Sequence, residues 1–347
     1  MRHIRYILID EMSFLGPRLF IQIDSRLREA FPENKSSPFG GRSIILVGDL
    51  GQLPPVKDKP LYAGNTAGKV LWKKFNIVVT LDTIFRQQGN DPKQYSFRNL
   101  LMNIRNAEPF FDDWELLMSR ASMDLPIEER SLFNSSLHLF PTNNLVDLHN
   151  RQMLKSLNSP IARCVAEHTR RTEIVGGDDD QLEREVLLCP GQRVMLTCNL
   201  WVEAGLVNGA LGYIKSIFYM SGSKPPQLPM YTTVLFDNYI GVPFDPINTK
   251  IVPITPVIRG NRKQIPLKMA WALTIHKSQG LTLERATIDI GKKEQQGLTF
   301  TSISRVKSID GLRISPPFSF QRYAKMKNSA YVTIRKKEEE RLKSVSL

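Results

Sequence analysis

Cysteine is scarce in this chain of 347 residues, and no apolar run is long enough to cross a bilayer. Cys164, Cys189 and Cys198 are odd in number and show no C-x-x-C spacing, which argues against a disulfide framework and against a zinc site. They are expected to be reduced thiols. The first residues lack the long apolar segment of a signal peptide. We therefore expect an intracellular protein with no transmembrane segment and no membrane partner.

Acidic residues are the minority among the charged ones. The 34 Asp and Glu face 47 Lys and Arg, giving a formal charge of +13, which favours a polyanionic partner, with nucleic acid as the first candidate. The basic residues are dispersed, so charge alone is equally compatible with a basic protein that binds no nucleic acid. With 41% hydrophobic residues the chain can bury several cores and is expected to be multidomain.

The first informative stretch is Tyr6–Ile9, an apolar run that leads directly into Asp10 and Glu11. This pattern is typical of a buried parallel strand whose carboxyl end opens into a ligand crevice. Adjacent carboxylates suit nucleotide hydrolysis, in which one holds Mg²⁺ and the other orients and deprotonates water. The alternative is a strand followed by a solvated helix N-terminus, where acids also suit the helix dipole.

A second strand predicted at Ser43–Val47 ends in the string Gly48-Asp49-Leu50-Gly51-Gln52-Leu53-Pro54-Pro55-Val56. Two neighbouring parallel strands can bring Asp10, Glu11, Asp49 and Gln52 around one crevice. The neutral amide of Gln52 can bond a terminal phosphate or the attacking water. A Gly-Asp turn followed by a Pro-Pro spacer explains each piece of the string, but not its place beside the upstream Asp-Glu strand.

The remaining pattern alternates helices and strands, which predicts an α/β fold. Between the first two strands, an amphipathic helix is expected from Leu15, Leu19, Ile23 and Leu27, widened by Phe20, Ala30 and Phe31 and stopped by Pro32. Further expected elements are a strand at Val78–Leu81, a helix through Phe97 and Ile104, a strand at Leu137–Phe140 with a following helix, and short β segments at 191–197, 205–214, 231–236 and 250–254.

Two later runs carry polar groups suited to phosphates. In Met269–Leu283, the residues His276, Lys277 and Ser278 stand between an apolar segment and Gly280, and can hold phosphates of a nucleotide or of DNA. In Thr299–Ser308, Arg305 lies on a segment rich in small residues and can stabilise charge on a transferring phosphoryl group. Either run could be plain surface by itself.

Together and in this order, the motifs resemble the petite-integration-frequency (Pif) family of DNA helicases, RecD-like members of superfamily one, and in particular the Helitron-associated branch. The resemblance covers nearly the whole chain. It is carried by Asp10-Glu11, Gly48-Asp49 with Gln52-Leu53-Pro54-Pro55, Phe85-Arg86-Gln87, Thr142-Asn143, Gly205-Leu206-Val207-Asn208-Gly209, His276-Lys277-Ser278-Gln279-Gly280 and Ser304-Arg305-Val306.

The resemblance implies an ATP- and Mg²⁺-dependent helicase that moves 5′ to 3′ along single-stranded DNA and unwinds duplex junctions, in DNA repair, recombination, telomere maintenance or Helitron transposition. A nuclear location is expected, with a monomer favoured. The catalytic residues would be Asp10 on Mg²⁺, Glu11 as general base, Gln52 on the γ-phosphate, and Arg86 and Arg305 as arginine fingers. Gln279 and Gly280 would join the nucleotide site, and DNA would be bound by Thr142, Asn143, His276, Lys277 and Ser278.

The implied fold has two RecA-like P-loop NTPase domains, the first one incomplete, with a small SH3-like β-barrel inserted in the second. The expected divisions are a partial RecA-like domain at 1–106, linker helices and the start of the second domain at 107–208, the barrel at 209–266, the rest of the second domain at 267–334, and a charged, solvated helical tail at 335–347. The acidic run Gly176–Asp180 is expected to be a solvated loop tip.

What the resemblance requires and the sequence lacks is a G-x-x-x-x-G-K-[ST] loop, whose backbone N–H groups and lysine cradle phosphates. The nearest string, Gly64–Val70, has the wrong spacing and is expected to be a surface loop. The expectation is therefore an N-terminally truncated helicase, inactive alone, whose first two strands keep unpaired edges. The alternatives are a non-catalytic remnant that binds single-stranded DNA, and a protein-moving ATPase, which the charge of +13 disfavours.

Overall fold

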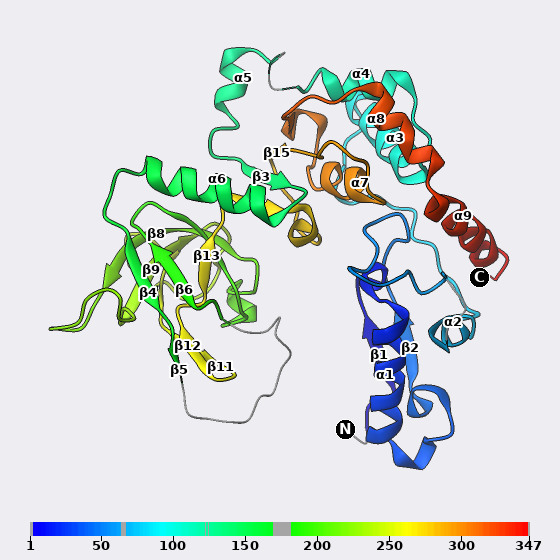
Figure 1. Ribbon diagram of the computed structural model, residues 1–347, viewed down its shortest axis with the longest axis horizontal. Coiled ribbons are helices and arrows are strands. Elements are labelled where there is room, and N and C mark those ends of the chain that lie inside the picture. The colour runs from blue at the N-terminus through cyan, green and yellow to red at the C-terminus, as the bar shows by residue number, and fades with distance from the viewer. Residues whose placement is uncertain (1–2, 64–66, 122, 124, 169–181, 346–347) are drawn as a thin grey trace. The chain divides into compact units, whose positions relative to one another are not determined.

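A computed structural model describes residues 3–63, 67–121, 123, 125–168 and 182–345. These residues form two compact units (Figure 1). The first unit runs from the N-terminus to Pro141 and resumes from Thr274 to the C-terminus, and the second unit is Thr142–Leu273. Helices and strands alternate along the chain, so the predicted mixed α/β class is confirmed. Among the described helices, none combines the length and the apolar character that a membrane span requires.

The first unit begins with two paired strands. β1 (Tyr6–Ile9) and β2 (Ser43–Leu46) are parallel, with Ile9 opposite Leu46 at their carboxyl ends. Figure 1 shows α1 (Pro17–Ala30) lying along them. Within the described residues no other strand joins this sheet, so each strand keeps one free edge. Both carboxyl ends point the same way, as the sequence predicts for a shared crevice.

Helix α1 covers one face of this sheet through a small aromatic core. Phe20 is fully buried and packs against Phe39, with ring centroids 5.3 Å apart. Asp24, also buried, accepts a hydrogen bond of 2.6 Å from the backbone N–H of Phe39 and pairs with Arg28. Leu19, which the four-residue repeat placed on the buried stripe, is instead exposed. The buried face follows Phe20, because 3.6 residues per turn rotate the strict four-residue repeat away from the core.

The rest of the first unit is built from short helices around a parallel sheet. β15 pairs with β3 on one side and with β16 on the other, both in parallel, and the chain returns from the second unit through β14 (Ala272–Thr274). The remaining elements are α2 (Ala67–Trp72), α3 (Pro92–Asn106), α4 (Phe111–Met118), α5 (Ile127–Ser131), β3 (Leu137–Phe140), β15 (Ala286–Ile288), α7 (Leu298–Ile303), β16 (Leu312–Ile314), α8 (Phe320–Ala324) and α9 (Ala330–Lys343).

The second unit is mainly β. After α6 (Asn143–Ser156), its largest sheet has the strand order β10-β9-β8-β7-β13, with all neighbouring strands antiparallel. The strands are β4 (Ala162–Val165), β5 (Glu167–His168), β6 (Glu185–Leu188), β7 (Arg193–Leu196), β8 (Leu211–Phe218), β9 (Tyr231–Phe236), β10 (Ile251–Ile254), β11 (Val257–Arg259), β12 (Arg262–Gln264) and β13 (Leu267–Met269).

One apolar core joins these strands, and it reaches beyond the predicted barrel. It includes Cys164, Leu188 and Leu196 as well as Val234 and Ile254, so β4, β6 and β7 pack with the segment 209–266. β13 also extends the sheet past residue 266. The three cysteines are free and buried. The division into family domains and the SH3-like barrel stay predictions.

Two expected local structures are wrong. Val78–Leu81 is not a strand: only Val78 makes an isolated bridge, and Val79 and Leu81 are 68% and 84% exposed. Apart from that bridge, none of the described strands extends over this segment. The string Gly64–Val70 is not simply a surface loop, because Ala67–Trp72 form α2 with Gly68 buried. Residues 64–66 and the acidic run Gly176–Asp180 lie outside the described residues.

The prediction that residues 335–347 form a solvated helical tail is also wrong. It belongs to α9, which starts at Ala330 and packs on the first unit next to α2 (Figure 1). Arg335 and Glu338 are only 3% and 9% exposed. Glu338 accepts a hydrogen bond of 2.7 Å from the indole N–H of Trp72. Some of the alternating charged side chains of this segment therefore bond other residues of the unit instead of facing only solvent.

Candidate nucleotide site

The predicted Asp-Glu pair follows β1 directly. Asp10 is exposed, and its Oδ1 accepts a hydrogen bond of 2.7 Å from the backbone N–H of Glu11. Glu11 has φ 53°, in the left-handed region that costs a non-glycine residue about 1–2 kcal/mol. The next backbone N–H, of Met12, is held by the carbonyl of Val47 at 2.9 Å. Such strain persists where neighbouring structure fixes it, often at functional sites.

The side chain of Glu11 is bonded by a residue from the far end of the chain. Gln279 Nε2 donates to Glu11 Oε2 at 2.5 Å, across a sequence separation of 268 residues. Gln279 follows η6 (Ile275–Ser278), and its own Oε1 is buried without a hydrogen-bond partner in the described residues. Gly280, next to it, is exposed with φ 82°. The structure thus brings together two residues that the sequence assigned to one site.

Arg86 and Arg305 converge on Ser304. Arg86 donates to Thr282 Oγ1 at 3.0 Å and to the carbonyl of Ser304 at 3.2 Å. Arg305 is 2% exposed and donates to the carbonyl of Thr301 at 2.8 Å and to Ser304 Oγ at 2.9 Å. Within the described residues Arg305 forms no ion pair. A buried guanidinium held only by neutral oxygens is free to receive an anion.

The electrostatics of this cluster favour a negative ligand. Burial, and secondly the charge of Arg86, lower the pKa of Arg305 to about 10, while Glu11 opposes the shift. Burial also lowers the pKa of Arg86, again against the effect of Glu11. Arg305 is still charged at neutral pH. Two guanidinium groups face a single carboxylate, which leaves one positive charge uncompensated.

Gln52 lies in the loop after β2, half-buried, with its backbone N–H bonded to the carbonyl of Asp49 at 3.1 Å. Its Oε1 is buried and has no hydrogen-bond partner in the described residues. The side chain lines a small pocket together with Met12, Ser13 and Gln296. The predicted contact between Gln52 and a γ-phosphate is not tested by this arrangement.

Asp49 was expected at the crevice, but its carboxylate is occupied. Arg105, at the end of α3, contacts Asp49 Oδ1 at 2.7 Å and also donates to Glu339 of α9 at 3.0 Å. Burial opposes the charge on Arg105, but Asp49 and Glu339 outweigh it and raise the pKa of the guanidinium. Sequence reasoning missed Arg105, since nothing in the local pattern of α3 distinguishes this arginine from a surface one.

The predicted DNA-binding residues have different surroundings. Lys277 is exposed and His276 is half-buried, and burial lowers the pKa of the His276 imidazole. Ser278 is fully buried and donates to the carbonyl of Ile275 at 2.8 Å, so its hydroxyl is not at the surface. Thr142 and Asn143 are exposed and begin the second unit. Their role at DNA stays a prediction.

The residues present offer some, but not all, of the groups that bind magnesium and a nucleotide. The described residues contain no group of three or more His, Cys, Asp or Glu side chains that could cage a metal. Mg²⁺ commonly binds through one or two carboxylates together with substrate phosphates, so the exposed Asp10 suits an ion carried by a nucleotide. Arg305 and Arg86 suit its terminal phosphate. The chain has no G-x-x-x-x-G-K-[ST] loop to hold the other phosphates.

Comparisons with known proteins agree with the motifs. Residues 1–110 match the family model of PIF1-like helicase. The chain is 29% identical over 314 residues to the human ATP-dependent DNA helicase PIF1, covering 89% of this chain and 45% of that protein. It is 26% identical to the ATP-dependent DNA helicase Pif1 of Campylobacter jejuni, covering 90% and 70% respectively. The chain thus spans about half the length of the vertebrate relatives that it matches.

Solved structures show the same fold. The Pif1 helicase from Candida albicans has a TM-score of 0.73 and 24% identity, covering 98% of this chain and 76% of that one. The Pif1 helicase from Bacteroides in complex with ADP-AlF3 and single-stranded DNA has a TM-score of 0.68 and 24% identity, covering 99% and 76%. The chain is thus similar to the PIF1-like helicases in sequence, over residues 1–110 of the family model, and it shares their fold.

Proposed function

We propose that this chain belongs functionally to an ATP-dependent DNA helicase of the PIF1-like kind. Such a helicase uses ATP to move 5′ to 3′ along single-stranded DNA and to unwind duplex junctions. The observation that carries the proposal is Arg305, which is buried beside Arg86 and Glu11 and forms no ion pair with any residue that the structure describes. A charged group kept out of water at such cost is expected where a phosphate arrives. The ATP-dependent helicases named above support this reading.

The residues divide the chemistry among them. Glu11 would orient and deprotonate the attacking water, with Gln279 fixing its carboxylate at 2.5 Å. Arg86 and Arg305 would stabilise charge on the transferring phosphoryl group, and Asp10 would hold Mg²⁺, which neutralises the phosphates. Gln279 is two residues from the exposed Lys277. We infer that this short link couples the state of the nucleotide to DNA contact.

The missing phosphate loop limits what these 347 residues can do by themselves. That loop supplies the lysine and the backbone N–H groups that bind the β- and γ-phosphates. Without it we expect weak ATP binding and no measurable turnover. The second candidate function, a non-catalytic protein that binds single-stranded DNA, is favoured by the same absence together with the charge of +13.

Nucleotide binding tests the site independently of turnover. Mg·ATP at ten times its Kd should stabilise the protein by about 1.4 kcal/mol, measured as a rise in Tm. Arg305→Gln and Arg86→Gln should each abolish this rise, whereas Arg26→Gln, an exposed arginine in the same unit, should keep it. An ATP effect that survives both site variants would refute the assignment. Arg86→Gln also covers the case that loss of the buried Arg305 impairs folding.

Turnover and DNA binding then separate the two functions. The rate of ATP hydrolysis by the wild-type chain, assayed with single-stranded DNA, should not exceed the rate of the Glu11→Gln variant. Glu29→Gln, at an exposed glutamate, is the matched control. Robust turnover lost in Glu11→Gln would overturn the expected inactivity and support the enzyme. DNA affinity that falls steeply with salt, in a protein showing no response to ATP, would favour the non-catalytic function. Absence of both responses would refute both functions.

A further inference from the structure

A second cationic cavity lies in the first unit, and neither Glu11, Arg86 nor Arg305 lines it. Its volume is about 350 Å³, and it is enclosed by the loop after β2, the end of α3, the loop before α7 and the connection from α8 to α9. Five basic side chains line it: Arg105, Lys292, Lys293, Lys325 and Arg335. None of them belongs to the proposed ATP site.

Arg335 is the most informative wall residue, because it is buried and poorly paired. Its Nε and Nη2 have no hydrogen-bond partner in the described residues. Its nearest carboxylate oxygen is Glu339 Oε1, at 3.8 Å from Nε, and that oxygen already accepts from Arg105 at 3.0 Å. A Cβ on Gly51, another wall residue, would lie 3.2 Å from Nη1. The guanidinium therefore lies at the wall with two unpaired donors, both of them shielded from solvent in this structure.

Charge around the cavity is not balanced. Glu294, the acidic residue among those that line it, pairs with Arg322, while Asp49 and Glu339, which are outside the lining, both pair with Arg105. By contrast, the three wall lysines, Lys292, Lys293 and Lys325, are exposed and make no ion pair among the described residues. Their three charges remain available to an anionic ligand.

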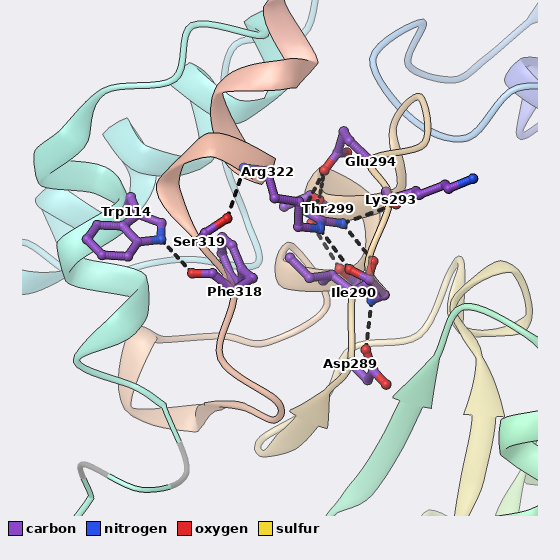
Figure 2. A network of polar contacts seen from close by, with 11 residues as sticks. Trp114, Asp289, Ile290, Lys293, Glu294, Thr299, Phe318, Ser319 and Arg322 are labelled. Atoms are coloured by element: carbon purple, nitrogen blue, oxygen red, sulfur yellow. Dashed lines mark hydrogen bonds and ion pairs between the residues drawn. The ribbon is translucent and has the colours of Figure 1, made fainter.

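The loop that carries two of these lysines is held in place before any ligand arrives. Figure 2 shows the buried Arg322 bonded to this loop, with Lys293 extending away from the network. Arg322 donates to the carbonyls of Ile290 and Gly291 at 2.7 and 2.8 Å and to Glu294 Oε2 at 2.6 Å. Thr299 Oγ1 donates to the same carboxylate at 2.7 Å. A site on such a fixed loop loses little entropy on binding.

We propose that this cavity binds a phosphate group. Arginine and lysine donors around one space match the tetrahedral phosphate oxygens, and Arg335 supplies donors that are otherwise unsatisfied in the folded protein. The group is either a free phosphate or pyrophosphate ion, or a phosphate of a single-stranded nucleic acid backbone. The proposal goes beyond the proposed function and does not depend on it.

Calorimetric titration of the full chain with inorganic phosphate and with pyrophosphate tests the site. The double variant Lys292→Ala/Lys293→Ala should weaken binding by about tenfold or more, because bonds from charged donors are lost. The control Lys327→Ala/Lys337→Ala removes the same charge from exposed positions outside the cavity lining. The proposal would be overturned if the wild type bound neither phosphate nor pyrophosphate and the lysine variant kept the DNA affinity of the wild type. It would also be overturned if the lysine variant and the control variant bound phosphate with equal affinity.

Two further experiments test which molecule supplies the phosphate group and whether the buried Arg335 binds it. If a labelled oligothymidine binds at least about tenfold more weakly to the lysine variant than to the control, and phosphate competes with it, the ligand is a backbone phosphate. If DNA affinity is unchanged while phosphate binding is lost, the ligand is a free ion. Arg335→Gln, checked for folding by circular dichroism, should weaken phosphate binding in either case, and unchanged binding would contradict the role of Arg335. In the Arg305→Gln background the lysine double variant should still weaken phosphate binding by about tenfold, which separates this site from the ATP site, and disappearance of that effect would overturn the separate site.

Discussion

Replacing Gly297 by alanine should damage the contact between the Gln52 loop and α7. Gly297 is the residue before α7 and has φ +71°. A Cβ added there would lie 2.3 Å from the carbonyl oxygen of Gln52 and 2.9 Å from the backbone nitrogen of Leu53. The blocking atoms are backbone, so no side-chain rotation can relieve the contact. The loop that carries Gln52 would have to move.

The expected cost has two parts. Left-handed backbone costs an alanine about 1–2 kcal/mol relative to the ordinary helical region. Overpacking against atoms that cannot swing aside adds about 1–3 kcal/mol. Gly280→Ala provides the matched control, because Gly280 has a similar φ of +82°, lies in the same unit, and has nothing within 4 Å of an added Cβ. It should show the first cost alone.

Thermal unfolding followed by circular dichroism measures the difference. For a unit of this size about 1 kcal/mol corresponds to about 2–4 °C, so Gly297→Ala should melt about 2–12 °C below Gly280→Ala. The ATP-induced rise in Tm should also shrink in Gly297→Ala, since Gln52 is displaced. Equal melting temperatures for the two variants would refute the close approach of Gly297 to the Gln52 loop.

Two further predictions concern the polar groups behind the site. Arg105→Gln should lower the free energy of unfolding by about 2 kcal/mol, less than the loss for a fully buried pair, because Asp49 and Glu339 keep about a fifth of their side-chain surface in solvent. The check is urea denaturation beside Arg163→Gln, which breaks a solvent-exposed pair and should cost clearly less; equal losses would contradict the prediction. Burial raises the pKa of Tyr62 to about 12 from 10.0, so the stability from its protonated form is complete below pH 10 and is lost as pH rises through 12. Tyr62→Phe should lose less stability over that range, and parallel urea midpoints for the two proteins would show the pKa of Tyr62 to be unshifted.

Local patterns were sufficient for much of the first unit. The apolar runs at Tyr6–Ile9 and Ser43–Leu46 form parallel strands as predicted, but the predicted burial is wrong, since Tyr6 and Leu8 are 69% and 63% exposed. The helix through Phe97 and Ile104 also forms, as α3, with both residues buried. The order of the motifs was enough to indicate the relationship with PIF1-like helicases.

Predictions failed where a segment depends on a distant partner. Val78–Leu81 has strand-forming residues but no described strand beside it, so it stays irregular. The charges of α9 look solvated in sequence, yet Glu338 is buried because Trp72 lies beside it. Neither the lack of a neighbouring strand nor the position of Trp72 can be read from a local window, because secondary-structure signals extend over a few residues whereas packing joins distant segments.

The sequence by itself determined which residue types stand at the predicted site: an Asp-Glu pair after a strand, and arginines on later segments. Only the tertiary structure decided that Gln279 bonds Glu11 across 268 residues, and that Arg305 is buried with no ion pair in the described part of the chain. Only the tertiary structure showed that Arg335, in the segment predicted as a tail, lines a cavity. The physical reason is that residue type limits what a group can do, whereas its partners and its desolvation are set by packing between distant segments.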